Sequence, residues 1–186
     1  MKKKLQFVSS QLAFTLVELL VVISIVGILA SLAVPSFQTQ MQQQRVEGAT
    51  ESLVAALHNA KAEAIKTNTP MKLVFTPTTL STTHATWCFG MVSAPVSTDT
   101  CNCTTANSCL AGSVVSSNDF AGITVNFNAD NERIFNPLRG TGTAGTVTFS
   151  AGNNRSLGVS VAGIGRIRIC RPANTIVGSY QDSGAC

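Results

Sequence analysis

Two arginines near the end of the chain have a type and spacing that suit phosphate binding. The stretch GIGRIRIC (163–170) alternates Arg166 and Arg168 with isoleucines directly after a glycine-rich turn. A guanidinium carries a planar fork of donors that matches phosphate, and it is weakly hydrated. Residues two apart on a strand share one face at about 6.6 Å, which is roughly the spacing of phosphates along an extended nucleic-acid strand. The alternative is that both arginines only keep the outer face of an edge strand in water.

The last third of the chain is basic, and all of its positive charge is arginine. No lysine follows Lys72, and the only acid beyond Glu132 is Asp182. The formal net charge of +4 hides this distribution, because three lysines stand at the N-terminus. Arg155 and Arg171 flank GIGRIRIC and join it as candidate contacts on charge alone. The arginines after Lys72 are Arg133, Arg139, Arg155, Arg166, Arg168 and Arg171.

Residue patterns for catalysis are missing from this sequence. The only histidines are His58 and His84, and no HExxH, GxSxG, phosphate-binding glycine loop or carboxylate cluster occurs. We expect His58 to have a surface or packing role on a helix rather than a ligand role, and Asp130, Glu132 and Arg133 to form a solvated turn. The sequence therefore predicts a protein that is not an enzyme and needs no cofactor.

Six cysteines in a chain that leaves the cytosol indicate up to three disulfides. We expect Cys170 to pair with Cys186, because no other cysteine lies near the C-terminus. Sequence does not choose among the pairings of the others. A metal site built from His84 and three cysteines is the alternative, although its spacing is not a usual zinc pattern. Those three cysteines are Cys88, Cys101 and Cys103, and the remaining one is Cys109.

The N-terminal segment has the composition of a membrane anchor. In the apolar run 14–34 only Glu18 is charged, and this run is long enough to cross a bilayer as a helix. A small residue, Ala13, stands before the run, so that cleavage there leaves the anchor on the mature protein. A secretory signal peptide has the opposite order, with its apolar region before the cleavage site.

From Ala13 to about Pro35 this segment resembles the class III signal of type IV pilins and type II secretion pseudopilins. The resemblance implies that residues 1–13 are a leader, that a prepilin peptidase cuts between Ala13 and Phe14, and that the new N-terminus is methylated. Ala13 stands where family members usually have glycine. The resemblance also implies that Glu18 pairs with the N-terminal amine of a neighbouring subunit during filament assembly. The alternative is that Glu18 lies near the membrane surface and stays hydrated.

One long helix is predicted over residues 14–67, with a membrane half at 14–34 and an amphipathic second half. Pro35 removes a backbone donor and is a point where the helix can kink. Asn68, Thr69 and Pro70 are expected to end the helix. Small and apolar residues recur at spacings of three and four along the second half, and they are Val46, Ala49, Leu53, Leu57, Ala60 and Ala64.

Residues 68–186 are predicted to form a β-rich periplasmic or extracellular domain. Its strands should be mainly antiparallel, because no helical period interrupts them, and residues 93–117 should form a long loop held by disulfides. The fold class is α+β, with a long N-terminal helix packed on the β-domain as in type IV pilins. The expected strands are 71–75, 86–92, 122–128, 146–150, 157–161 and 166–170.

The tetrapeptide GRIR (165–168) resembles the G-R-x-R pattern of FimT/GspH-type minor pilins and pseudopilins. For FimT-type members that pattern implies DNA binding during natural transformation, with Gly165 in the turn and Arg166 and Arg168 at the contact. Three functions stay open: a DNA-binding minor pilin, a structural minor pilin, and the H-type pseudopilin of a type II secretion system. All three imply a single-pass inner-membrane protein whose partners are other pilins and a prepilin peptidase, with DNA added for the first.

Overall fold

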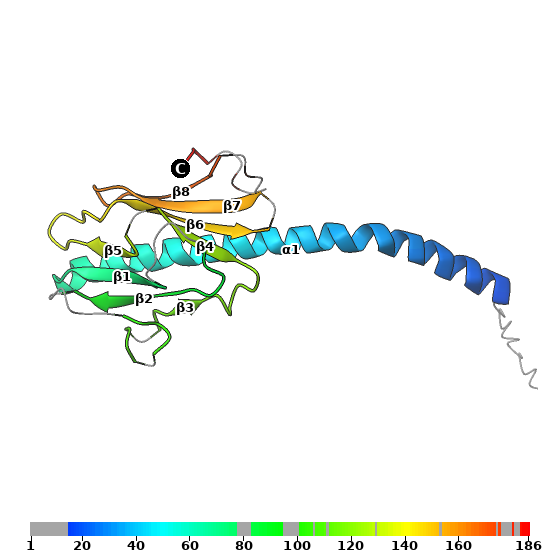
Figure 1. The fold of residues 1–186 in the computed structure, drawn as a ribbon, viewed down its shortest axis with the longest axis horizontal. Helices are drawn as coiled ribbons and strands as arrows, with labels where there is room; N and C mark the ends of the chain where they lie inside the picture. The colour runs from blue at the N-terminus through cyan, green and yellow to red at the C-terminus, as the bar shows by residue number, and fades with distance from the viewer. Residues whose placement is uncertain are drawn as a thin grey trace, which may run out of the picture. The chain divides into compact units, whose positions relative to one another are not determined.

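The computed structural model describes residues 15–77, 83–94, 101–105, 107–110, 112–128, 130–152, 154–173, 175, 180 and 183–186. The leader, Ala13, Phe14 and Asp182 lie outside the described residues. Within these residues one helix is followed by eight strands, and every pair of adjacent strands is antiparallel (Figure 1). The elements are α1 (Leu16–Thr67), β1 (Met71–Thr76), β2 (Cys88–Ser93), β3 (Val115–Ser116), β4 (Thr124–Phe127), β5 (Glu132–Phe135), β6 (Gly145–Ala151), β7 (Arg155–Val161) and β8 (Ile167–Cys170).

The first half of α1 belongs to a compact unit, Met1–Thr39, that is separate from the folded unit Gln40–Cys186. Its described side chains from Leu16 to Ala33 are exposed, and this part of the helix is long and apolar enough to cross a membrane. Thr15 caps the helix, because its Oγ1 accepts a hydrogen bond from the Glu18 amide at 3.2 Å. The predicted anchor is therefore a regular, capped helix.

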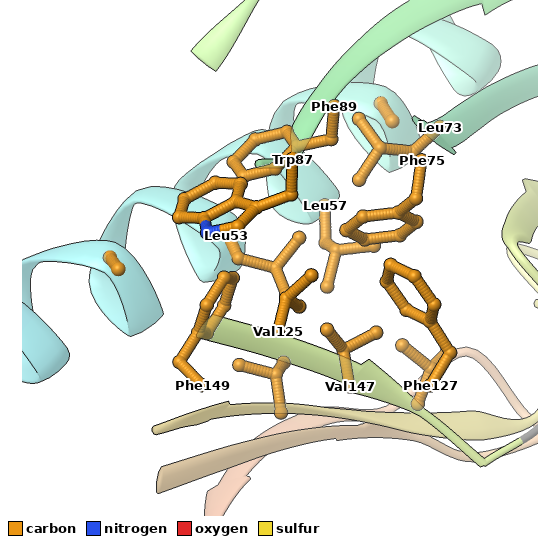
Figure 2. Close-up of a cluster of buried hydrophobic side chains, with 14 of the residues drawn as sticks. Leu53, Leu57, Leu73, Phe75, Trp87, Phe89, Val125, Phe127, Val147 and Phe149 are labelled. Atoms are coloured by element: carbon orange, nitrogen blue, oxygen red, sulfur yellow. The ribbon is translucent and has the colours of Figure 1, made fainter. Parts of the chain in front are cut away.

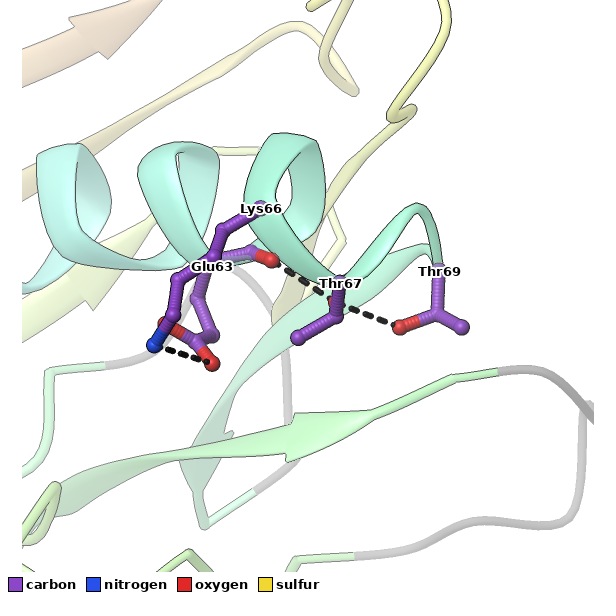
Figure 3. A network of polar contacts seen from close by, with 4 residues as sticks. All are labelled: Glu63, Lys66, Thr67 and Thr69. Atoms are coloured by element: carbon purple, nitrogen blue, oxygen red, sulfur yellow. Dashed lines mark hydrogen bonds and ion pairs between the residues drawn. The ribbon is translucent and has the colours of Figure 1, made fainter.

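The predicted end of the helix is confirmed, and local contacts explain it (Figure 3). Asn68 has φ 51°, in the left-handed region that terminates helices. Thr67 Oγ1 donates to the Glu63 carbonyl at 2.7 Å and lies 2.7 Å from Thr69 Oγ1. Lys66 pairs with Glu63 at 3.2 Å in the last turn, where a positive charge favours the helix dipole.

The amphipathic stripe of α1 is confirmed, because all six predicted residues are fully buried in the core. Figure 2 shows side chains of α1 and of both sheets pointing into one cluster. The ring centroids of Phe75 and Phe127 lie 4.9 Å apart and join the two sheets, and those of Trp87 and Phe149 lie 5.1 Å apart. Trp87 also donates from Nε1 to the Ile123 carbonyl at 2.8 Å. His58 lies on the exposed side of the helix, as expected.

The strands form two sheets of four, with the orders β3-β2-β1-β5 and β4-β6-β7-β8. The predicted antiparallel pairing is confirmed. Two strands were not predicted: β3 lies inside the expected loop 93–117, and β5 includes Glu132 and Arg133 of the expected solvated turn. Alternation fails as a signal for both, because β3 has two residues and β5 carries two charges.

The prediction of a solvated turn at Asp130–Arg133 is wrong. Arg133 lies opposite Leu73 of β1 and is 1% exposed. Its Nη1 donates to the Asp130 and Glu132 carbonyls at 2.7 Å each, while its Nε and Nη2 have no partner among the described residues. Burial lowers the pKa of Arg133, and the Asp130 charge acts in the opposite direction. Glu132 pairs with the buried Lys72 at 3.1 Å.

In each sheet a glycine packs directly against a disulfide. The Cys170–Cys186 pairing is confirmed, and a Cβ on Gly158 of β7 would lie 3.0 Å from Cys170 Sγ. A Cβ on Gly90 of β2 would lie 2.7 Å from Cys101 Sγ. The other disulfides are Cys88–Cys103 and Cys101–Cys109. These pairings leave no free thiol for the alternative metal site, which is therefore wrong.

We expect Leu53→Ala to destabilise the folded unit by about 2–5 kcal/mol, because the substitution leaves a cavity where helix and sheets meet. Ile65→Ala is the matched control on the same helix, since Ile65 is exposed, and it should change stability by less than about 0.5 kcal/mol. Trp87 is the single tryptophan and is buried, so its fluorescence during denaturant unfolding reports both values. Equal effects of the two variants would contradict the core described above.

Candidate functional site

The predicted hairpin that carries the arginines is confirmed. Val161 of β7 lies opposite Ile167 of β8. The turn between them is closed by hydrogen bonds from the Ala162 amide to the Arg166 carbonyl at 2.9 Å and from the Gly165 amide to the Ala162 carbonyl at 2.7 Å. Gly165 has φ 75°, and a Cβ there would overlap the Gly140 carbonyl oxygen. The turn therefore requires glycine at this position.

Arg166 and Arg168 both lie on the solvent side of this hairpin and are exposed. Arg168 lies opposite Ser160, whereas Ile167 and Ile169 are half-buried and pack against the core. Strand alternation thus separates arginines from isoleucines, as the sequence predicts. In the described part of the chain neither guanidinium forms an ion pair with a carboxylate. β8 is the last strand in the order of its sheet.

The C-terminal segment 183–186 contacts the side chain of Arg168 and the backbone of Arg171. Arg168 Nη2 donates to the Ala185 carbonyl at 3.3 Å. The Arg171 amide donates to the Gly184 carbonyl at 2.9 Å, and the Cys186 amide donates to the Arg171 carbonyl at 3.1 Å. Arg171 is half-buried. With the Cys170–Cys186 disulfide, these bonds fix the Cys170 end of β8, which we call the arginine strand.

Tyr180 contacts the long helix, and its carbonyl accepts a hydrogen bond from the amide of Ser183 in the C-terminal segment at 3.1 Å. Its hydroxyl donates to Glu51 Oε1 at 2.7 Å. That hydrogen bond is the main reason why the pKa of Tyr180 is raised to about 12, with burial and the negative charges of Glu51 and Glu47 adding to it. The tyrosine hydroxyl therefore keeps its proton at neutral pH and continues to donate.

Arg155 is not brought together with the other three arginines. It begins β7 opposite Ala151, at the end of the strand away from the turn that follows Val161. The strand from Arg155 to Val161 spans about 20 Å at the usual rise per residue. Arg155 also has the parity of Leu157, which faces the core, so alternation directs it away from the face that carries Arg168.

Two residues that sequence reasoning did not place at the site support or extend it. Lys61 of α1 donates from Nζ to the Gly165 carbonyl at 2.9 Å, and its Cε lies 3.1 Å from where a Cβ of Gly140 would be. Gly140 belongs to the turn 136–142, which also contains the exposed Arg139. Only the tertiary structure reveals these contacts, because Lys61 is 104 residues from Gly165 in the sequence.

The chemistry open to this surface is the binding of anions. Arg166, Arg168 and Arg139 present guanidinium groups to solvent, and no acid lies between Arg133 and Arg171 in the sequence. In the described ranges no group of three or more metal-ligating side chains occurs. A phosphate-bearing polymer matches an extended row of such groups.

Gly165→Ala should destabilise the folded unit by at least about 1 kcal/mol, because alanine is strained at positive φ and its Cβ would displace the neighbouring turn. Gly163→Ala is the control in the same turn: nothing lies within 4 Å of its Cβ position and its φ is not positive. Denaturant unfolding followed by Trp87 fluorescence measures both. A Gly165→Ala protein as stable as Gly163→Ala would show that the turn is not fixed as described.

Comparison with known proteins identifies two segments. The model of the family described as type II transport protein GspH matches residues 49–165, and the prokaryotic N-terminal methylation motif matches residues 8–34. The type IV minor pilin FimU of Pseudomonas aeruginosa PAO1 is a similar solved structure, with 19% identity and a TM-score of 0.45, covering 70% of this chain and 99% of its own. No curated protein matches the chain.

The methylation motif overlaps the apolar half of α1, and together they form the single-pass inner-membrane anchor of a pilus or pseudopilus subunit. The GspH match begins within the amphipathic half of α1 and extends to Gly165 at the arginine turn. It covers more than half of the 186 residues. This chain therefore belongs to the GspH family of type IV minor pilins and pseudopilins.

Proposed function

We propose that this chain is a minor type IV pilin, most similar to the FimT type, that binds DNA without sequence preference and supports DNA uptake in natural transformation. The observation that carries the proposal is the exposure of two arginines at the same hairpin: Arg166 directly precedes the edge strand β8, and Arg168 lies on it. The strand sets their spacing at about 6.6 Å. Contacts between arginine side chains and phosphates do not distinguish one base from another.

The rigidity of the arginine strand supports binding as well as display. The turn is fixed by Lys61 at one end of β8, and the Cys170–Cys186 disulfide fixes the other. A preorganised surface loses less conformational entropy when it binds, so more of the contact energy appears as affinity. The hydrogen bond from Arg168 to Ala185 occupies one of five guanidinium donors and leaves others for phosphate. Arg171 follows β8 directly but has the parity of Ile169, which packs against the core, so we assign no phosphate contact to Arg171 or to Arg155.

A second candidate is a subunit without any DNA contact, either a structural minor pilin or the H-type pseudopilin of a type II secretion system. The description of the matching family favours it. In that case the arginines serve only to keep an edge strand soluble. Two features favour DNA: every basic residue after Lys72 is an arginine, and acids are missing between Arg133 and Arg171.

Replacing both Arg166 and Arg168 with Gln should lower the affinity of the full chain in neutral detergent for DNA at least about tenfold, because hydrogen bonds to charged groups are lost. The slope of log affinity against log salt should also fall by the contribution of about two phosphates, roughly 0.9 each on duplex DNA. Fluorescence anisotropy with labelled DNA measures both quantities. Arg155→Gln removes one guanidinium charge from the other end of β7 and should leave affinity within about twofold.

In cells the double variant should lose transformation while pilus number and protein secretion stay unchanged. Wild-type affinity in the double variant would overturn the DNA proposal. Loss of secretion with no change in transformation would favour the pseudopilin.

Glu18 carries a second part of the proposed function, which is assembly. It lies in the first turn of α1 and is exposed there. We propose that its carboxylate pairs with the N-terminal amine that cleavage between Ala13 and Phe14 creates on a neighbouring subunit. A carboxylate within an apolar helix is costly without such a partner.

Glu18→Ala should block incorporation into filaments while membrane insertion is retained, because the apolar run is unchanged. Immunoblots of sheared filaments and of membrane fractions measure the two outcomes. Glu63→Ala removes a carboxylate from the other end of α1, where it pairs with Lys66, and should assemble normally. Normal incorporation of Glu18→Ala would refute the assembly role.

A further inference from the structure

Two exposed apolar side chains lie at the tips of turns next to the arginine strand. Leu138 is 84% exposed and Ile164 is 73% exposed, and they are the two most exposed large apolar residues among the described residues of Gln40–Cys186. Leu138 directly precedes Arg139, and Ile164 stands two residues before Arg166. Each tip thus combines an apolar side chain with a guanidinium.

Hydrogen bonds within each turn hold its tip outward. In the turn 136–142, the Gly140 amide donates to the Asn136 carbonyl at 2.9 Å, and the Leu138 amide donates to Asn136 Oδ1 at 3.0 Å. In the turn 162–166, the Gly165 amide donates to the Ala162 carbonyl at 2.7 Å. Leu138 and Ile164 are therefore exposed at the tips of turns that are closed by hydrogen bonds.

The two turns are joined to each other and to α1. The Gly142 amide donates to the Gly163 carbonyl at 3.2 Å, and Gly165 packs directly on the Gly140 carbonyl. Lys61 contacts both turns from the helix. Figure 1 shows the yellow and orange loops at the end of the domain where α1 ends. We call this paired-turn surface, made by Leu138, Arg139, Ile164 and Arg166, the tip surface.

We infer that the tip surface contacts unpaired bases, so that single-stranded DNA is the preferred ligand. This inference rests on the proposed DNA-binding function and names its substrate class. Arginines alone match the phosphates of either form of DNA. Apolar side chains gain free energy only when an apolar surface covers them, and the faces of unstacked bases offer such a surface.

Duplex DNA offers Leu138 and Ile164 much less apolar surface to contact. Its bases are stacked inside the helix, and an inserted apolar wedge must first unstack a base step. A single strand carries no such penalty, because its bases are already accessible. The arginines should therefore contribute to both complexes, whereas Leu138 and Ile164 should contribute chiefly to the complex with single strands.

The test compares the full chain, in neutral detergent, with a double variant that replaces Leu138 and Ile164 by Ser. The probes are a single-stranded oligonucleotide of about 16 nucleotides, near the upper site size of single-strand-binding folds, and a duplex of the same length. We expect the wild-type chain to bind the single strand at least about fivefold more tightly, and the variant to lose about tenfold in single-strand affinity. Its duplex affinity should change less than about twofold.

Val114→Ser is the matched control, because Val114 is 44% exposed and directly precedes β3, at the edge of the other sheet. It should leave both affinities unchanged. Equal affinity of the wild-type chain for both probes, or a Leu138/Ile164 variant that binds single strands normally, would overturn the inference. The proposed function would survive either result if Arg166→Gln with Arg168→Gln still abolished binding.

Anionic phospholipid vesicles, for example of phosphatidylglycerol, form the last arm of the test, since lipid surfaces also combine phosphate with apolar groups. Vesicle binding that depends on Leu138 and Ile164, without any binding of DNA, would assign the tip surface to a membrane. That outcome would overturn both the inference and the proposed function. Single-strand binding that depends on Leu138, Ile164, Arg166 and Arg168, with weak vesicle binding, would support both the inference and the proposed function.

Discussion

Burial of one stripe on the second half of α1 is the interaction on which the folded unit depends. Val46, Leu53, Leu57 and Ala60 are fully buried, and they cover the inner faces of both sheets at once. The stripe also directs the next residue of the helix, Lys61, towards the arginine turn, whose Gly165 carbonyl accepts its hydrogen bond. The packing of the core and the position of the candidate site therefore have the same origin.

Disulfides and glycines complete the structure on the faces that the helix does not cover. Gly158 and Gly90 each lie on a strand whose outer face carries a disulfide, where any larger side chain would collide with sulfur. On the second sheet, the Cys170–Cys186 bridge also holds the C-terminal segment beside β8, where Ala185 accepts a hydrogen bond from Arg168. The arginine strand, although at the edge of its sheet, is thus supported at both ends. A binding surface built this way needs little reorganisation when a ligand arrives.

The sequence predicted those parts of the fold that have a clear period or a single plausible partner. The helix stripe, the hairpin with Arg166 and Arg168 outward, and the Cys170–Cys186 bridge are all confirmed. It did not predict β5, because Arg133 is buried by pairing with β1, a contact between segments that no local pattern records. For the same reason it placed Arg155 with the other arginines and omitted Lys61 and Arg139. Proximity along the chain was a poor guide to proximity across the sheets.

Hydrogen exchange of backbone amides, measured by mass spectrometry on the full chain with and without single-stranded DNA, tests the proposed binding surface most directly. The account predicts added protection in two segments, residues 136–142 and 162–171, because the turns and the arginine strand form one surface joined by the Gly142–Gly163 hydrogen bond. The disulfide-rich segment 101–110 should exchange as before. Protection confined to that segment, or to the first half of α1, would contradict the account.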